Sequence, residues 1–212
     1  MAGFDPYCRR CSRLAAFLDE IGSAHPDYHA RPVPSFGDPR ARLLVVGLAP
    51  GLHGANATGR PFTGDDAGEL LYRTLYAFGL SSAPRSQSAD DGLVLRDCRI
   101  TNAVRCVPPA NRPRGDEVRR CRPYLIDELT RLPQGGVALA LGRVAHEAVL
   151  RAFGLSPAHA AFGHGACYPL PGPRWLLDSY HCSRYNTRTR RLTEGMFAAV
   201  FEQAVTLLGS RP

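Results

Sequence analysis

Four of the seven cysteines form two pairs whose spacing is typical of metal ligands. Two residues separate Cys8 from Cys11, and fourteen residues separate Cys106 from Cys121. Four thiolates from two distant segments suit a tetrahedral zinc ion or a four-iron four-sulfur cluster. The wide second pair is unlike a second zinc knuckle and favours the iron–sulfur cluster. Four buried thiols without a ligand are the third interpretation.

A glycine-rich segment, residues 47–68, has the sequence GLAPGLHGANATGRPFTGDDAG. Its glycines allow close approach of the backbone to a ligand. It lacks the lysine of a Walker motif and the G-x-G-x-x-G spacing of a dinucleotide site. Phe62, among small residues, suits stacking on a planar base. Asp65 and Asp66 are the carboxylates of the segment, and capping of the next helix would explain at least one of them.

Two more polar side chains could act on a ligand. Asn111 follows two prolines in the segment 102–113, and its amide can pair with the carbonyl and NH edge of a nucleobase. His181 directly follows a predicted strand, where its ring can donate to a developing anion. Each residue alone is a weak signal, because turn asparagines and structural histidines are common.

Residues 179–193, SYHCSRYNTRTRRLT, combine cationic, aromatic and hydroxyl side chains. Such a mixture suits phosphate contacts and base stacking, and the alternative is a solvated basic loop. The candidate nucleic-acid contacts are Arg184, Tyr185, Asn186, Arg188, Arg190 and Arg191.

Arginine supplies all 26 cationic side chains, and the net charge of +7 favours a polyanionic partner. The absence of lysine excludes Schiff-base catalysis by a lysine amine. No apolar run reaches membrane-spanning length, and the N-terminal sequence has no signal-peptide core. We therefore expect a cytoplasmic protein without a membrane partner, in which cysteines are ligands rather than disulfides.

The order of elements predicts an α/β fold. Apolar runs predict strands, and helical periodicity predicts helices between them. The strands are expected at 43–48, 99–104, 137–141 and 174–179, and the helices at 12–22, 66–78, 116–132, 143–152 and 193–208. Alternating strands and helices predict a three-layer α/β/α sandwich with a four-stranded parallel sheet, formed by a single domain over residues 1–212. The loops that carry the candidate functional residues follow three of these strands, so they should converge on one cleft.

Taken together, these motifs resemble the uracil-DNA glycosylase superfamily, and most closely its fifth family, the type B enzymes. The resemblance rests on the Cys-x2-Cys start, the GLAPG loop ending in PFTGD, the NAVRCVPPANRP segment and the HCSRYNT loop. The fourth family usually has an acidic residue in its GEAPG loop, where this chain has Leu48. Another departure is Arg190, where relatives often have glycine.

The resemblance implies the uracil-DNA glycosylase fold and a [4Fe–4S] cluster held by Cys8, Cys11, Cys106 and Cys121. It implies a glycosylase that flips uracil and other deaminated bases out of DNA. The absence of lysine predicts that this enzyme is monofunctional and leaves an abasic site without strand cleavage. Asp65 is then the acidic catalyst, and Asn111 and His181 stabilise the departing base. The substrate-binding set is Gly47, Leu48, Ala49, Pro50, Gly51 and Phe62.

The expected partner is damaged duplex DNA, with single-stranded DNA as an open alternative, and the chain is expected to act as a monomer. Two other classes stay open. One is a non-catalytic DNA-binding module with structural zinc, and the other is a redox iron–sulfur protein.

Overall fold

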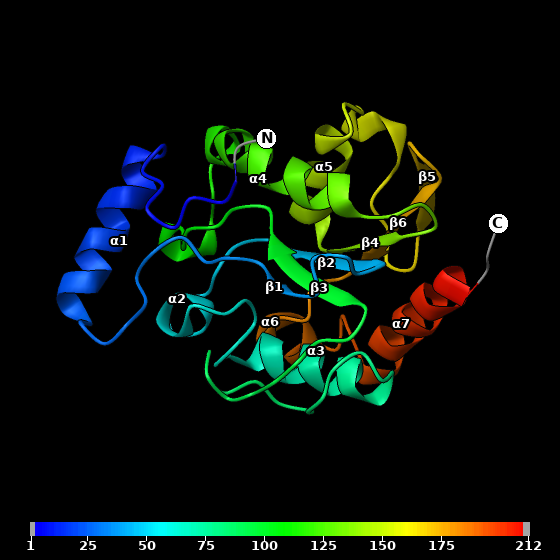
Figure 1. The fold of residues 1–212 in the computed structure, drawn as a ribbon, viewed down its shortest axis with the longest axis horizontal. Helices are drawn as coiled ribbons and strands as arrows, with labels where there is room; N and C mark the ends of the chain where they lie inside the picture. The colour runs from blue at the N-terminus through cyan, green and yellow to red at the C-terminus, as the bar shows by residue number, and fades with distance from the viewer. Residues whose placement is uncertain (1–2, 210–212) are drawn as a thin grey trace.

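Four central strands form a parallel sheet at the positions that the apolar runs predict (Figure 1). The computed structural model describes residues 3–209. The strands are β2 (Leu43–Gly47), β3 (Cys98–Asn102), β4 (Val137–Leu141) and β6 (Arg174–Ser179), in the order β3-β2-β4-β6. The register pairs Gly47 with Asn102 and Leu141 with Ser179. The carboxyl ends of the strands therefore lie at one edge, as in other open parallel sheets.

Within residues 3–209 the sheet has six strands, and the prediction of four was wrong because each outer side of the sheet carries a short antiparallel strand. β1 (Phe36–Gly37) pairs with β3, and β5 (Cys167–Leu170) pairs with β6. A strand as short as β1 leaves no periodic pattern, and Pro169 interrupts the signal of β5. Proline is tolerated there because an edge strand has one side without ladder partners. The fold is thus α/β with a mixed, mostly parallel sheet.

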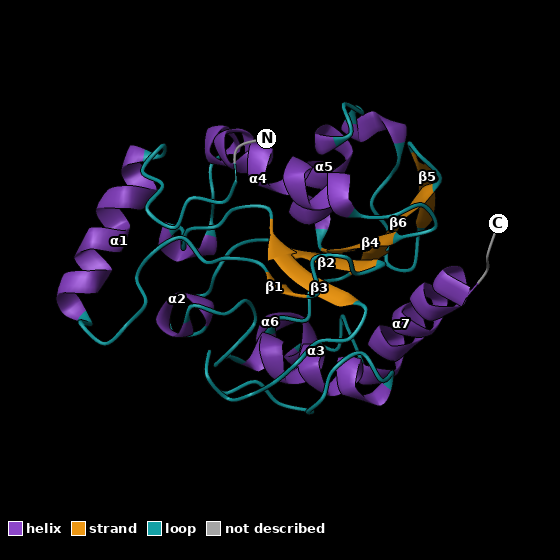
Figure 2. Cartoon of the chain, in the orientation of Figure 1, coloured by secondary structure: helices purple, strands orange, loops and turns teal. Residues whose placement is uncertain are grey.

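Helices cover both faces of the sheet (Figure 2). They are α1 (Ser12–Ala24), α2 (Ala55–Thr58), α3 (Asp66–Ala77), α4 (Gly115–Arg131), α5 (Arg143–Ala152), α6 (Arg184–Arg188) and α7 (Glu194–Gly209), with 3-10 turns η1 (Pro109–Asn111) and η2 (Pro157–His159). Leu43 and Val45 pack against α3 and α7, whereas Leu44 and Val46 pack against α4 and α5. This alternation follows from the pleat of a strand that is buried on both sides.

The segment expected to be a basic loop contains the short helix α6. Its arginine, tyrosine, asparagine and threonine residues have no apolar periodicity, so helical pattern analysis could not find it. Within residues 3–209, no helix has the length and apolar character needed to cross a bilayer.

Candidate active site

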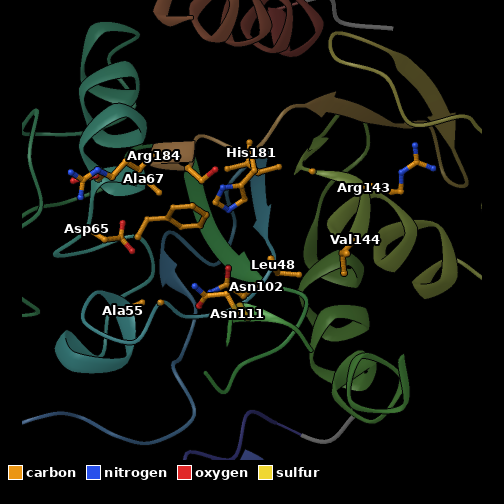
Figure 3. Close-up of a pocket in the computed structure, with 17 residues that line it drawn as sticks. Leu48, Ala55, Asp65, Ala67, Asn102, Asn111, Arg143, Val144, His181 and Arg184 are labelled. Atoms are coloured by element: carbon orange, nitrogen blue, oxygen red, sulfur yellow. The ribbon is translucent and has the colours of Figure 1, made fainter. Parts of the chain in front are cut away.

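A cavity of about 620 Å³ opens at the carboxyl edge of the parallel strands. Its lining comes from the loops after β2, β3, β4 and β6 and from the start of α3 (Figure 3). The lining residues are Leu48, Ala49, Gly51, Ala55, Phe62, Asp65, Asp66, Ala67, Asn102, Asn111, Leu141, Gly142, Arg143, Val144, His181, Ser183 and Arg184. The predicted convergence of the loops on one cleft is therefore observed.

Phe62 forms an aromatic wall of the cavity. Its ring stacks on His181, with centroids 5.8 Å apart and planes inclined by 26°. The backbone of Phe62 has a φ of +54°, a left-handed conformation that is strained for an aromatic residue. Tyr72 Oη donates to Pro61 O at 2.9 Å. Gly68 packs against the same turn, since a Cβ there would lie 1.8 Å from Phe62 O.

Asp65 combines the helix-capping role with a position in the cavity. It is the N-cap of α3, and its Oδ1 accepts a hydrogen bond from Gly68 N at 2.9 Å. Its Oδ2 faces the glycine-rich loop, where a Cβ at Gly54 would come within 2.4 Å of it. Burial raises the pKa of Asp65 above its usual value, and the hydrogen bond from Gly68 opposes this shift.

His181 faces the same cavity and is neutral at physiological pH. Burial lowers the pKa of His181 to about 4, because desolvation disfavours the imidazolium. Asn186 Nδ2 donates to the His181 carbonyl at 2.8 Å, so α6 holds the backbone of this residue. A neutral ring can donate one hydrogen bond to an anion in the cavity.

Two asparagines also reach the cavity. Asn111, in η1, is exposed and has a φ of +54°. Asn102 ends β3 and is buried, and its Oδ1 has no hydrogen-bond partner within residues 3–209. A buried amide oxygen without a partner, on a residue that lines the cavity, is a candidate ligand contact. The sequence pattern does not single out Asn102, because the strand expected at 99–104 places it inside the strand, whereas β3 ends at this residue.

The predicted substrate loop is only partly in the cavity. Leu48, Ala49 and Gly51 line it, whereas Gly47 and Pro50 do not. Gly47 instead allows close packing, because a Cβ there would lie 2.3 Å from Asn102 Oδ1 and 2.6 Å from the Phe62 ring. Arg143, which no sequence motif singled out, begins α5 and also lines the cavity.

The basic segment borders the cavity at one end. Arg184 lines it and pairs with Asp66, with Nε and Oδ2 3.0 Å apart. Tyr185 is 71% exposed, and the Arg191 guanidinium lies 4.8 Å from the Tyr180 ring centroid.

The other predicted nucleic-acid contacts of this segment differ in exposure and in hydrogen bonding. Arg188 and Arg190 are exposed, and Asn186 turns back to hold the His181 carbonyl. Arg190 has a φ of +56°, a conformation in which glycine is less strained.

The four predicted metal ligands lie together, away from the active-site cavity. Cys8, Cys11, Cys106 and Cys121 line one small hollow between α1, α4 and the segment after β3. They are free thiols, and within residues 3–209 no group of three or more Cys, His, Asp or Glu side chains is placed so that it could hold a metal ion. Arg105 N donates to Cys121 Sγ at 3.3 Å. A four-sulfur donor set with backbone N–H support fits a zinc ion or an iron–sulfur cluster.

The three other thiols do not belong to this group. Cys98 and Cys182 are buried in the core between the sheet and α3 and α7, and Cys167 packs against that core.

The chain matches the model of the uracil DNA glycosylase superfamily over residues 34–205. It therefore belongs to that superfamily. Within it, the chain is 52% identical to the type-5 uracil-DNA glycosylase of Thermus thermophilus, over 95% of this chain and 94% of that protein. It is 42% identical to the type-5 uracil-DNA glycosylase of Pyrobaculum aerophilum, over 95% and 89%. The resemblance to the fifth family is thereby confirmed.

More distant similarities have lower identity. The type-4 uracil-DNA glycosylase of Archaeoglobus fulgidus is 35% identical over 80% of each chain. The crystal structure of Pedobacter heparinus SMUG2 superposes with a TM-score of 0.51 at 14% identity, covering 81% of this chain and 77% of that one. The last match shows a shared fold.

Proposed function

We propose that this protein is a monofunctional uracil-DNA glycosylase of base excision repair. It hydrolyses the N-glycosidic bond of a base flipped out of DNA and leaves an abasic site. The proposal rests on one observation: the same cavity is lined by Phe62, Asp65, Asn111 and His181. The membership of the chain in the superfamily and its similarity to type-5 enzymes support the same conclusion.

Base recognition begins with extrusion of the damaged nucleotide, since the glycosidic bond is inaccessible in a stacked duplex. The base stacks on Phe62, and the Asn102 amide, whose Oδ1 has no partner within residues 3–209, binds its edge. Backbone groups near Leu48 and Gly51 add further contacts. The part of the lining between Leu48 and Ala55 has no charged side chain, which suits uracil, hypoxanthine and xanthine alike.

Bond cleavage separates charge between the sugar and the base. As the C1′–N bond breaks, its electron pair leaves with the base, and the sugar becomes an oxocarbenium-like cation. The Asp65 carboxylate stabilises this cation and orients the water whose oxygen bonds to C1′. The proton released by that water passes to Asp65 or to solvent.

The departing base carries negative charge, which His181 and Asn111 stabilise through hydrogen bonds. His181 acts as a neutral donor rather than as an acid, because burial holds its pKa at about 4. With no lysine in the chain, the abasic product is released without a lysine Schiff base or strand cleavage.

DNA is held by the basic segment at the cavity rim. Arg184, Tyr185, Arg188, Arg190 and Arg191 contact phosphates or stack on exposed bases, and Asn186 positions His181. We further propose that the chain acts as a monomer formed by one glycosylase domain, in keeping with the family match over residues 34–205.

The four cysteines lining the second hollow would hold a [4Fe–4S] cluster, which when bound ties α1 to α4. Iron and zinc analysis of the purified protein distinguishes the cluster from a zinc ion.

Single-turnover excision from a duplex with one uracil tests the roles of the active-site residues. We expect Asp65→Ala, Asn111→Ala and His181→Ala each to slow excision by about 100-fold or more. Rates near wild type for all three variants would refute the assignment.

A further inference from the structure

Arg60 is a cation of the glycine-rich loop that is almost fully buried, with 5% of its surface exposed. Its partners come from the polar segment of residues 81–92 that follows α3. Nη1 donates to Ser86 Oγ at 2.9 Å and to Asp91 Oδ1 at 2.6 Å, and Nη2 donates to Ala89 O at 2.5 Å. The guanidinium also lies 4.3 Å from the centroid of the Phe36 ring.

Asp91 also binds backbone amides of its own segment. Its Oδ2 accepts from Gln87 N at 2.8 Å, and its Oδ1 accepts from Leu93 N at 3.0 Å. Burial favours the neutral acid, but the hydrogen bonds from Arg60 and from these amides outweigh it and lower the pKa of Asp91 to about 2. The pair is therefore charged on both sides. Truncating one partner of such a pair leaves the other buried and uncompensated.

The segment that binds Arg60 also contacts Thr63, the residue after Phe62. Thr63 Oγ1 and Ser86 Oγ are hydrogen-bonded at 2.8 Å. Ser86 thus contacts Arg60 and Thr63, the residues two positions before and one position after the aromatic ring. The φ of +54° at Phe62 persists only if its surroundings over-determine that conformation. These contacts fix the backbone on both sides of the strained residue.

We propose that Arg60, with Ser86 and Asp91, is a positioning clasp that holds the Phe62 ring where the extruded base stacks. This inference rests on the proposed function and extends it to a segment that does not line the cavity. Without the clasp, the turn relaxes away from the left-handed conformation and the stacking surface moves. Excision then slows because the reacting bond is misaligned with Asp65, whereas the basic segment still binds DNA.

The first test compares single-turnover excision by Arg60→Gln and Ser86→Ala with the wild-type rate at saturating enzyme. We expect Arg60→Gln to slow excision by about 10- to 100-fold, and Ser86→Ala to slow it less. Arg42→Gln is the control for loss of an arginine–aspartate pair, since Arg42 bonds Asp97 and the Leu208 carbonyl at the amino end of β2, opposite the cavity. A control variant that is as slow as Arg60→Gln would overturn the proposal.

A double-mutant cycle with Phe62→Ala separates positioning from a general folding defect. If Arg60 acts through the ring, Arg60→Gln should slow the Phe62→Ala enzyme by less than about twofold. Equal fold-losses in both backgrounds would show that Arg60 acts elsewhere and would overturn the proposal. The proposal is also overturned if Phe62→Ala is as active as wild type while Arg60→Gln is slow.

Binding without catalysis distinguishes failure of the clasp from failure of the proposed function. The probe is a duplex containing 2′-fluoro-deoxyuridine, compared with the undamaged duplex. Wild-type protein should prefer the probe, and Arg60→Gln should lose about 10-fold of that preference while binding undamaged DNA normally. An unchanged preference in the variant would overturn the clasp alone. No preference in wild-type protein would overturn the proposed function and the clasp that rests on it.

Discussion

Gly68 offers a direct test of how closely the cavity depends on the packing beneath Phe62. A Cβ at this position would lie 1.8 Å from Phe62 O and 2.7 Å from Phe62 C, both backbone atoms that cannot rotate away. Ordinary carbon–oxygen contacts need more than about 3 Å, so Gly68→Ala forces a displacement of about 1 Å. The displaced parts are the Phe62 turn or the start of α3, which carries Asp65.

The expected cost follows from that displacement. Misplacing a reacting group by about 1 Å slows an enzyme by about 100-fold, and overpacking a tight contact costs about 1–3 kcal/mol of stability. The assay is single-turnover excision of uracil from a duplex, measured well below the melting temperature of the variant. Affinity for an undamaged duplex should change less than the excision rate, and any change should come through Arg184, which pairs with Asp66 at the start of α3.

Gly195→Ala is the matched control, since Gly195 also lies in the first turn of a helix. Within residues 3–209, a Cβ added there would meet no atom within 4 Å other than its chain neighbours and its own helix backbone. Removing this glycine should stabilise α7 by up to about 1 kcal/mol and leave excision unchanged. If Gly68→Ala excises uracil within about twofold of the wild-type rate, the packing argument for the cavity is wrong.

Four other outcomes are expected. Because burial lowers the pKa of His181 to about 4, titration of this ring should not change the excision rate between about pH 5.5 and about pH 8. The pH profiles of the wild-type and His181→Gln enzymes should therefore have the same shape in that range. His146 is buried, with Nδ1 2.9 Å from Asp178 and Nε2 3.0 Å from a carbonyl; burial opposes its charge, but the bond to Asp178 outweighs this and raises its pKa. Its stabilising charge is complete below about pH 6.5 and lost as pH rises through the raised pKa, so denaturant titrations should show that His146→Gln costs most stability at low pH. Cys106→Ser should lower bound metal and melting temperature, whereas Cys167→Ser should retain the metal, as elemental analysis will show. Borohydride should trap no covalent adduct with DNA at an internal residue, because the chain has no lysine.

The parallel strands could be predicted because each is a short, continuous apolar run between glycine- or proline-rich loops. The observed β2 and β4 match the expected 43–48 and 137–141 within one residue. The edge strands could not be predicted, since their pairing comes from the neighbouring strand rather than from their own pattern. Helix α6 was missed for a similar reason, because its five residues gain their order from contacts with His181 and Leu192.

The site could be predicted in part. Asp65 and His181 stand out because they follow directly on recognisable loops and strands, and the structure places both at the cavity. Asn102 was hidden inside an apolar strand pattern, and only its unpaired amide reveals it. No sequence motif singles out Arg60, which the structure shows to be buried. Its partners, Ser86 and Asp91, lie more than twenty residues away in a segment with no regular pattern.

The central claim is that this cavity hydrolyses the glycosidic bond of an extruded base without cutting the strand. The most direct test is a labelled duplex with one uracil opposite guanine, incubated with metal-loaded protein and then divided into halves with and without hot alkali. Strand breaks at the uracil position only after alkali are the predicted result. Breaks without alkali, or no breaks in either half, would contradict the account.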